Sequence, residues 1–326
     1  MATEALLEVE SVTKYYPVSK GIGQSGPRES VRALNGLSFT VNRGETVALV
    51  GESGCGKTTT AKAVLGLEKP SSGSLRLKGE DIYTLRGSKY RAYRRSVQAV
   101  FQDPWASLNP RMRIGDIISE PLEVNTRLSK HEIYARVDKA LEDVGLQTDY
   151  RSRYPHEFSG GQRQRIAVAA ALVCEPELIV LDEPVSSLDV SIRAQIMNLL
   201  KDLQDKYGMS YLLIAHDLAT TRYMCDRIAV MYLGSIVELA GSEELFSRPM
   251  HPYTQALFSA ALPSHPDVTR DEIVLSGEVP SPINPPSGCP FHTRCFKYLG
   301  GVCKEKEPQL QEMAEGHWVA CHLYDT

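Results

Sequence analysis

The sequence predicts an α/β fold, and three stretches carry this prediction. Residues 37–67 give in order a strand, a turn, a buried strand, a glycine-rich loop and a helix, which is how a β–loop–α unit opens. Two apolar runs, at 177–183 and 210–217, have the length of buried strands. Between them, residues 193–208 predict a helix that ends at a glycine. Strands that alternate with helices favour a sheet covered by helices.

The remaining segments have weaker patterns. Residues 6–13 alternate apolar and polar side chains, which predicts a strand with one buried face. Apolar residues near helical spacing predict a helix over 130–144, and glycine and serine in 19–30 predict a surface loop. After about residue 246 the chain becomes proline-rich and polar. We therefore expect this tail to add little hydrophobic core and to need a metal or a cross-link for its stability.

Length and composition narrow the class of protein. The chain has 326 residues, of which 42% are hydrophobic and 23% charged, enough for one large domain with a small appendage. Its net charge of -4 argues against a basic footprint over the whole surface, so nucleic acid is not an expected partner. The N-terminus lacks a basic, apolar signal segment, and no apolar run approaches the roughly 20 residues that span a bilayer. We expect a soluble, cytosolic chain.

The segment GESGCGKT begins at Gly51 and has the spacing of a phosphate-binding loop. Gly51, Gly54 and Gly56 let backbone N–H groups turn towards phosphates, and the helix that follows presents its positive end. Lys57 brings a charge to the β- and γ-phosphates, and the hydroxyl of Thr58 suits Mg²⁺. The alternative, a purely structural glycine turn, is disfavoured because the loop follows a strand and opens a helix.

Two carboxylates end the apolar run LIVLDEP. Asp182 is placed to hold Mg²⁺, directly or through water, and Glu183 to orient or deprotonate the attacking water. The alternative is a carboxylate pair that caps the next helix. The upstream phosphate-binding loop favours the catalytic interpretation.

A second anion-binding helix start lies in the segment FSGGQRQR. Its Ser159, Gly160 and Gly161 open a helix, and such a start binds anions through free N–H groups. One bound nucleotide does not need two anion-binding helix N-termini from the same chain. If two copies of the chain face each other, however, each nucleotide can contact one such N-terminus from each copy. The alternative is an ordinary helix-capping turn.

In this order and at this spacing, the motifs from residue 6 to about 245 resemble those of the ATPase subunits of ATP-binding cassette (ABC) transporters. The resemblance implies a phosphate-loop NTPase fold with a RecA-like core, an antiparallel β part and a helical subdomain at about 103–175. It implies an ATPase domain at 1–245 and a small cysteine-bearing extension at 246–326. It identifies further motif residues: Tyr16 in the aromatic loop, Gln102 in the Q-loop, Ser187 and Asp189 in the D-loop, and His216 as the switch histidine.

The family's mechanism then implies a role for each matching residue. The expected ATP contacts are Tyr16, Gly51, Glu52, Ser53, Gly54, Cys55, Gly56, Lys57, Thr58 and Thr59. The expected contacts to ATP on a partner subunit are Ser159, Gly160, Gly161, Gln162 and Asp189. The expected Mg²⁺ ligands are Thr58, Gln102 and Asp182, and the expected catalytic residues are Glu183, His216 and Gln102. ATP is thus expected between two subunits arranged head to tail.

The tail carries a narrower resemblance. Residues 251–263, 275–295 and 316–324 look like the C-terminal extension of ATPases from peptide-type importers, including oligopeptide, dipeptide and nickel systems. This implies a transport ATPase, or translocase, peripheral on the cytoplasmic face of the inner membrane. Its implied partners are a second ATPase, expected to be a paralogue, two permease subunits and, indirectly, a periplasmic or extracellular binding protein. The alternative is a soluble ABC ATPase of DNA repair or ribosomes, which usually has two cassettes or long coiled coils.

Four cysteines gather in the tail: Cys289, Cys295, Cys303 and Cys321. Four thiolates suit Zn²⁺ or an iron–sulfur cluster, although the spacing lacks the C-x2-C pattern of zinc sites. The family resemblance implies a [4Fe–4S] cluster on these four residues, with a structural role. Zn²⁺, free thiols, disulfides and a redox sensor remain alternatives.

The other cysteines and the histidines near the tail cysteines have simpler expected positions. The tail's histidines, His292, His317 and His322, are an alternative source of ligands for the cysteine site but are expected at the surface. The remaining cysteines, Cys55, Cys174 and Cys225, are expected singly in the core.

Overall fold

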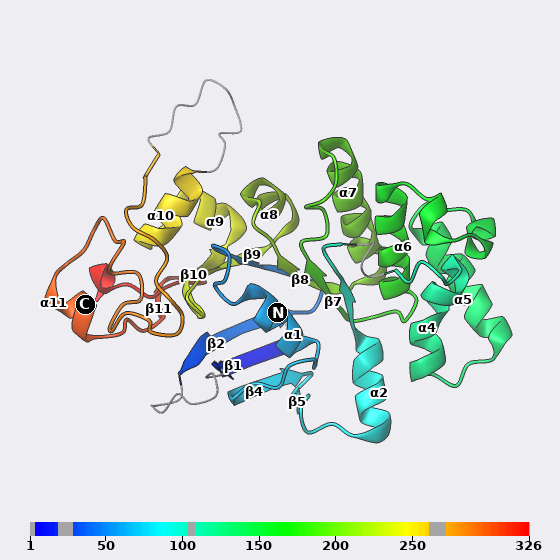
Figure 1. The fold of residues 1–326 in the computed structure, drawn as a ribbon, viewed down its shortest axis with the longest axis horizontal. Coiled ribbons are helices and arrows are strands. Elements are labelled where there is room, and N and C mark those ends of the chain that lie inside the picture. The colour runs from blue at the N-terminus through cyan, green and yellow to red at the C-terminus, as the bar shows by residue number, and fades with distance from the viewer. Residues whose placement is uncertain (1–3, 19–28, 104–107, 261–271, 326) are drawn as a thin grey trace, which may run out of the picture. The chain divides into compact units, whose positions relative to one another are not determined.

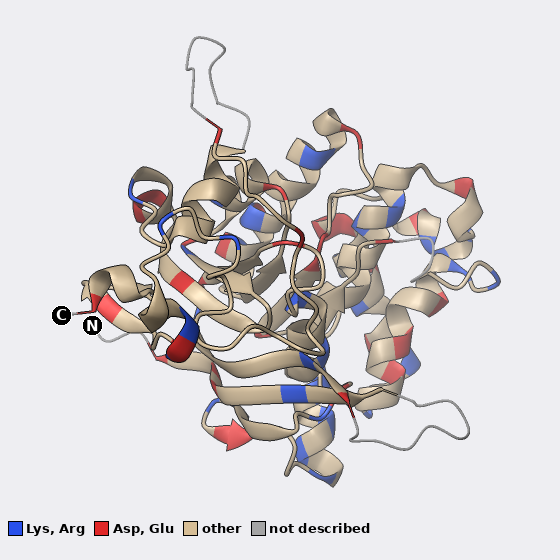
Figure 2. Cartoon of the chain, turned by 60° about the vertical axis from the view of Figure 1, so that its left-hand side comes forward, with Lys and Arg blue, Asp and Glu red and all other residues tan. Residues whose placement is uncertain are grey.

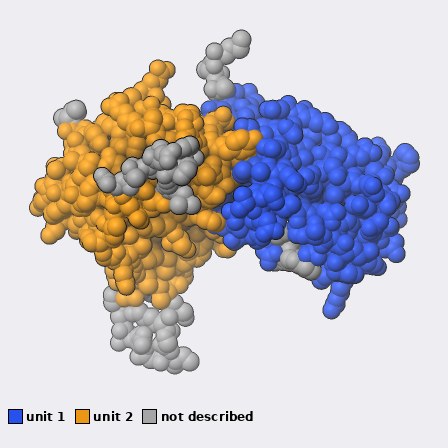
Figure 3. Space-filling view, turned by 90° about the horizontal axis from the view of Figure 1, so that it is seen from above, with its two compact units in different colours: residues 1–7, 40–46, 76–214 blue, residues 8–39, 47–75, 215–326 orange. Residues whose placement is uncertain are grey.

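A computed structural model describes residues 4–18, 29–103, 108–260 and 272–325. Most of the predicted loop at 19–30, and residues 104–107 of the predicted helical subdomain, lie outside the described residues. The chain divides into two compact units, which Figure 3 shows in different colours. Unit 1 comprises residues 1–7, 40–46 and 76–214, and unit 2 comprises residues 8–39, 47–75 and 215–326.

Unit 1 is built on three parallel strands, β6 (Val97–Val100), β7 (Leu178–Asp182) and β8 (Ser210–Ile214), with β7 in the middle. Leu178 lies opposite Val97 on one side and Ser210 on the other. The apolar side chains of β7 and β8 are buried, which explains why both strands are continuous apolar runs rather than alternating ones. The strands predicted at 177–183 and 210–217 are confirmed.

Some helices of unit 1 begin or end at recognisable signals. The described helices of this unit are α2 (Gly87–Ser96), α4 (Ile114–Asn125), α5 (Lys130–Asp143), α6 (Gly160–Leu172) and α7 (Val190–Tyr207), with the short turns η1 (Thr148–Ser152) and η2 (Pro155–Glu157). Ser129 caps α5, and α7 ends at Gly208 in the left-handed conformation. The helices α4, α5 and α6 pack against one another (Figure 1). The helices predicted at 130–144 and 193–208 are confirmed.

In unit 2, β3 (Thr46–Val50) runs parallel to β9 (Arg227–Tyr232), and β10 (Ser235–Gly241) runs antiparallel to β9. Two strands of the tail continue this sheet, because β12 (His317–Val319) pairs with β10 and β11 (Gln311–Ala314) pairs with β12. The helices are α1 (Lys57–Val64), α8 (Leu218–Met224), α9 (Ser242–Ser247), α10 (Pro252–Ser259) and α11 (Gly301–Glu305), and η3 (His322–Tyr324) is a single turn.

A second sheet has the order β2-β1-β4-β5. Its strands are β1 (Ala5–Pro17), β2 (Ser30–Asn42), β4 (Ser72–Leu77) and β5 (Glu80–Asp81). Strand β1 contains the segment 6–13, so the predicted strand is confirmed. Its predicted single buried face is not regular, because the neighbours Leu6 and Leu7 are both buried and Ser11 has a left-handed φ of 46°. Among the described residues, no helix has the length and apolar character that crossing a membrane requires.

The tail contributes more core than its composition predicts. Phe291 has no exposed surface and contacts the rings of Tyr232, Tyr253 and His251 at centroid distances of 5.2, 5.4 and 5.7 Å. The expectation of a core-poor tail is therefore wrong at this position. A single aromatic side chain that fills a site between α10 and β9 buries as much apolar area as several smaller residues.

A buried carboxylate also ties the tail to the sheet of unit 2. Glu238 on β10 is fully buried, and its oxygens accept hydrogen bonds from the amides of Met250 (2.7 Å) and His251 (2.9 Å) and from Nε2 of His317 (2.8 Å). His317 is only 1% exposed, so its predicted surface position is wrong. Hydrogen bonding to Glu238 raises the pKa of His317, because the carboxylate favours the imidazolium.

We expect His317→Leu to lower the free energy of unfolding by about 3 kcal/mol, since Glu238 then keeps its buried charge without this partner. Because the folded-state pKa is raised, the ionic contribution is complete below the ordinary value of about 6.5 and fades as pH rises through the raised pKa. Urea unfolding of both proteins, at a pH on each side of this range, measures the difference. The exposed His131→Leu on α5 is the control, and an equal loss in both variants, or no pH dependence, contradicts the prediction.

Candidate functional site

The phosphate-binding loop of unit 2 connects the buried strand β3 to helix α1. Gly51, Gly54 and Gly56 have φ angles of 149°, 82° and 111°, a region that side chains other than glycine rarely adopt. The packing is also close, because a Cβ on Gly51 would lie 2.2 Å from the carbonyl oxygen of Met231. A Cβ on Gly56 would lie 2.6 Å from that of Ala33. Conformation therefore favours glycine at all three positions, and space also requires it at Gly51 and Gly56.

Lys57 lies at the first position of α1 and folds back over this loop. Its Nζ donates hydrogen bonds to the carbonyl oxygens of Gly51 (2.7 Å) and Glu52 (3.1 Å), and the side chain is buried. The ammonium is thus held at the centre of the loop. Thr58 in the same turn is exposed, so its hydroxyl is accessible to a cation. Burial raises the pKa of the Cys55 thiol, an effect that the nearby Lys57 opposes.

The other predicted residues of unit 2 lie on separate elements. Tyr16, near the end of β1, is half-buried, and Lys14 Nζ lies 4.9 Å from its ring centroid. His216 is exposed and follows the buried run that contains β8. The next residue, Asp217, caps α8 by accepting a hydrogen bond from the amide of Ala219 (2.9 Å).

Unit 1 brings two predicted catalytic residues together. Nε2 of Gln102 donates a hydrogen bond to the carboxylate of Glu183 at 2.7 Å. Glu183 follows β7 with a φ of 50°, and its amide donates to the carbonyl of Ile214 on β8 (3.0 Å). A left-handed conformation is uncommon for glutamate, and strain of this kind occurs often at functional sites. The Ser187 hydroxyl donates to the Gln102 carbonyl at 3.4 Å, so the D-loop also contacts this group.

The predicted signature residues form the start of α6. Ser159 is the N-cap, and it exchanges hydrogen bonds with Gln162: its hydroxyl accepts from the Gln162 amide (3.4 Å), and its own amide donates to Gln162 Oε1 (3.0 Å). Ser159 and Gly160 are exposed, as a contact with another subunit requires. Gly161 packs on α7, where a Cβ would lie 2.8 Å from Cγ2 of Ile192. Asp189 precedes α7 as its N-cap residue.

The four cysteines of the tail lie close together in unit 2. The amide of Cys289 donates to the carbonyl of Cys303 at 2.8 Å, and both residues are buried, whereas Cys295 and Cys321 are half-buried. All four are free thiols, as are Cys55, Cys174 and Cys225, so the disulfide alternative is not supported. Cys55, Cys174 and Cys225 are buried, as predicted.

The electrostatics of these thiols bear on the predicted metal centre. Burial raises the pKa of Cys289 to about 12 and of Cys321 to about 11, and the other three thiols of the group also contribute to the shift at Cys289. Thiols in such a setting become thiolates only when a cation compensates the charge. Among the described residues, no group of three or more His, Cys, Asp or Glu side chains is arranged to hold a metal ion. Neither Zn²⁺ nor the [4Fe–4S] cluster is therefore confirmed.

Sequence reasoning missed three residues that support the loop and the tail. Arg294 forms a double hydrogen bond with Glu52, at 2.8 and 3.1 Å. The hydroxyl of Tyr253 accepts a hydrogen bond from the Glu52 amide (2.8 Å). The buried Glu238 is the third. Each of these residues pairs with a residue far away in the sequence. The only feature of the sequence that could have indicated a role for Tyr253 and Arg294 is that they lie within two of the tail segments that resemble the family.

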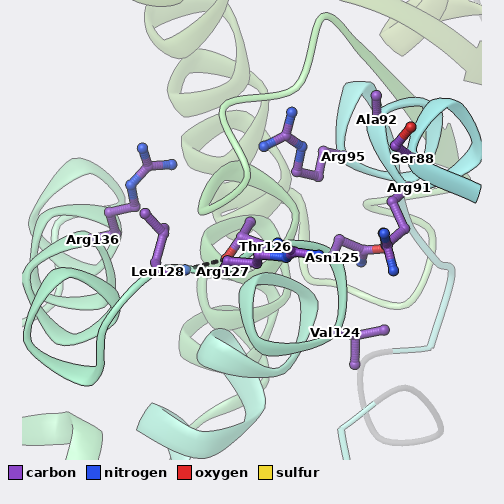
Figure 4. A pocket seen from close by; sticks show the side chains of 10 residues that line it. All are labelled: Ser88, Arg91, Ala92, Arg95, Val124, Asn125, Thr126, Arg127, Leu128 and Arg136. Carbon is purple, nitrogen blue, oxygen red and sulfur yellow. Dashed lines mark hydrogen bonds between the residues drawn. The ribbon is translucent and has the colours of Figure 1, made fainter.

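A hollow in unit 1, of about 430 Å³, lies apart from the predicted site residues (Figure 4). Arg91 and Arg95 line it from α2, Arg127 from the segment after α4, and Arg136 from α5. Elsewhere on the described chain, basic and acidic residues are interspersed (Figure 2). The hollow contains none of the motif residues, so it adds nothing to the predicted ATP site.

Comparison with known proteins identifies two family regions. Residues 34–186 match the family "ABC transporter", and residues 237–303 match "oligopeptide/dipeptide transporter, C-terminal region". The oligopeptide transport ATP-binding protein AppF of Bacillus subtilis is 49% identical over 98% of both chains. The dipeptide transport ATP-binding protein DppF of Escherichia coli is 46% identical over 99% of this chain and 95% of the other.

Solved structures of ATP-binding cassettes share the fold. The protein cbiO1 of Clostridium perfringens, part of an ABC transporter complex, is 32% identical with a TM-score of 0.64, over 75% of this chain and 92% of the other. A dimeric cassette in a post-hydrolysis state bound to ADP and Pi is 28% identical with a TM-score of 0.63, over 72% of this chain and 98% of the other.

The start of α6 offers a matched pair of variants. Ser129→Ala and Ser159→Ala each remove a capping-box hydroxyl, so we expect each to lower the free energy of unfolding by about 1 kcal/mol. If Ser159 also binds a phosphate, only Ser159→Ala lowers ATP turnover, by about tenfold or more, because a hydrogen bond to a charged group is lost. Urea unfolding and phosphate release measure the two effects. Equal turnover in both variants rejects the phosphate contact.

Proposed function

The chain belongs to the ATP-binding subunits of ABC transporters, in the oligopeptide and dipeptide branch, and we propose that it hydrolyses ATP to drive the import of peptides or similar small solutes. The observation that carries the proposal is similarity at 46–49% identity over nearly the whole chain, tail included. The alternative, a soluble cassette that is not coupled to transport, is disfavoured because these relatives are transport proteins.

ATP binds at the phosphate-binding loop in this proposal. The backbone amides of the loop and the ammonium of Lys57 contact the phosphates, and the ring of Tyr16 stacks on the adenine. Thr58, Asp182 and Gln102 would supply the oxygen donors that Mg²⁺ prefers, and a cation held there would neutralise charge on the phosphates. The accessible Thr58 hydroxyl and the carboxylate of Asp182 fit this donor chemistry.

Hydrolysis depends on placement of one water molecule. Glu183 accepts a hydrogen bond from this water and draws its proton away, while Gln102 fixes the Glu183 carboxylate through the hydrogen bond of 2.7 Å. His216 contacts the γ-phosphate and helps to order the site. Most of the catalysis comes from positioning and charge stabilisation, as is usual for phosphoryl transfer.

The site is completed by a second ATPase subunit placed head to tail, as the dimeric state of a related cassette supports. The partner's counterparts of Ser159, Gly160, Gly161, Gln162 and Asp189 then close over the nucleotide. A paralogue is the proposed partner. Two permease subunits hold the ATPases on the cytoplasmic face of the inner membrane, and a periplasmic or extracellular binding protein delivers the solute. Nucleic acid is not among the proposed partners.

We further propose that Cys289, Cys295, Cys303 and Cys321 hold a [4Fe–4S] cluster. Each thiolate of such a site binds a different iron atom, so the sulfurs need not converge on one ion. The proximity of the four thiols, two of them buried and two half-buried, supports this donor set. The role is structural, because binding of the iron centre adds folding free energy to a segment that has few apolar residues.

We expect Glu183→Gln to keep ATP binding and to lower turnover by about 10²–10⁴-fold, the range for loss of a general base. Glu175→Gln is a matched control, since Glu175 also has a left-handed conformation, with a φ of 51°. Binding of ATP and release of phosphate are measured on the full chain with its partner subunits. Near-normal turnover in Glu183→Gln refutes the catalytic role.

For the cysteine site, we expect wild-type protein purified without oxygen to contain iron and acid-labile sulfide and to absorb visible light. Cys295→Ser lowers both contents, because a ligand is lost. Cys174→Ser replaces a buried cysteine of unit 1 and leaves both unchanged. Zinc in place of iron, or equal iron in the two variants, contradicts the proposed cluster.

A further inference from the structure

The phosphate-binding loop is braced by the tail at Glu52. The guanidinium of Arg294 donates two hydrogen bonds to the two carboxylate oxygens of Glu52, at 2.8 and 3.1 Å. The Arg294 side chain is only 8% exposed and that of Glu52 is 28% exposed. A two-pronged, charge-assisted contact of this kind fixes the orientation of both groups, and burial shields it from solvent.

The backbone of the same residue has a second contact. The Glu52 amide donates a hydrogen bond to the hydroxyl of Tyr253 at 2.8 Å, and Tyr253 on α10 has no exposed surface. Tyr253 in turn packs against Phe291. Both the side chain and the main chain of Glu52 are therefore held by residues of the tail.

Glu52 is adjacent to the groups that hold the phosphate-binding lysine. Lys57 Nζ donates to the carbonyl oxygens of Gly51 and Glu52. Rotation of the backbone at Glu52 moves the second of these oxygens and the amides that follow it. The contact between Arg294 and Glu52 therefore influences the position of Lys57, with Glu52 as the connecting residue.

The turn that carries Arg294 is part of the cysteine site. It runs from Cys289 to Cys295, and the Arg294 amide donates to the carbonyl of Phe291 at 3.0 Å. Cys289 pairs with Cys303 through a backbone hydrogen bond of 2.8 Å. Whatever holds the cysteines in place therefore also holds Arg294.

A hollow shows a further contact between the loop and the tail. Residues 52–55 of the loop and residues 279–282 of the tail line a cavity of about 180 Å³, together with Tyr232 and Leu233. The same tail segment also contacts strand β2, where the amide of Arg32 donates to the carbonyl of Pro282 at 2.9 Å. The tail therefore lies along the loop over several residues, and Arg294 is its charged contact.

We propose that Arg294 is a positioning residue of the ATP site: through Glu52 it fixes the phosphate-binding loop, so that the state of the cysteine site sets the affinity for ATP. The inference rests on the proposed function, since it assumes that the loop binds ATP and that the cysteines share a ligand. It assigns to the tail a part in nucleotide binding.

The first test measures binding of MgATP to the full chain. Arg294→Gln raises the Kd about tenfold, because the loop binds less well. With the partner subunits present, it changes kcat at saturating ATP by less than about twofold, because the catalytic residues are intact. Arg294→Lys gives an intermediate Kd, since lysine keeps the charge and loses the two-pronged geometry. Lys297→Gln, an exposed cation in the same segment, leaves the Kd unchanged.

A double-mutant cycle shows whether Arg294 acts through Glu52. Glu52→Gln alone raises the Kd as Arg294→Gln does, and the double variant is no weaker than either single variant. Additive losses overturn the proposed route. Thermal unfolding checks each variant, and if Arg294→Gln does not fold, Glu52→Gln and Arg294→Lys carry the test.

The second test concerns the cysteine site. Cys295→Ser raises the Kd for MgATP in the presence of Arg294 and has no further effect in the Arg294→Gln variant. An equal effect in both backgrounds overturns the link. If wild-type protein does not bind MgATP, the proposed function fails; if it binds and Arg294→Gln binds equally well, this inference alone fails.

Discussion

The close approach of the phosphate-binding loop to the end of β9 is the constraint on which the nucleotide site depends. Gly51 brings its backbone against the carbonyl of Met231, where no side chain fits. This close approach directs the Gly51 carbonyl to Lys57. The next residue, Glu52, is held by contacts from other segments of unit 2. The conformation of the loop is therefore determined by the segments that pack around it.

Elements with strong local signals are predictable from the sequence. The strand β7 is a short apolar run bounded by polar residues, and α7 ends at Gly208 because glycine adopts the left-handed conformation at least cost. The start of α6 is equally predictable, since a serine and a glutamine three residues apart form a capping box. Motif spacing then located the phosphate-binding loop and the residues near Glu183, because their chemistry requires particular residue types.

Contacts between distant segments were not predictable. Nothing in the sequence links Arg294 to Glu52, or His317 to Glu238. The sequence around a histidine does not show whether the side chain is buried, because its partner lies far away along the chain. The average composition of the tail also gave a wrong prediction of its core. Phe291 is fully buried although the segments around it are proline-rich and polar. The proximity of the four cysteines was suggested by family resemblance and not by their spacing.

The strands contributed by the tail have a consequence for solubility. Strand β12 occupies the free hydrogen-bonding edge of β10, with Glu238 opposite Val319 and Leu239 opposite Trp318. An open edge strand is a template on which other chains add strands and aggregate. Among the described residues, the tail places the four-residue strand β11 at this edge of the sheet, where the seven-residue β10 would otherwise lie. A shorter edge strand offers fewer unpaired backbone groups to another chain, an effect that does not depend on nucleotide or on the cysteine site.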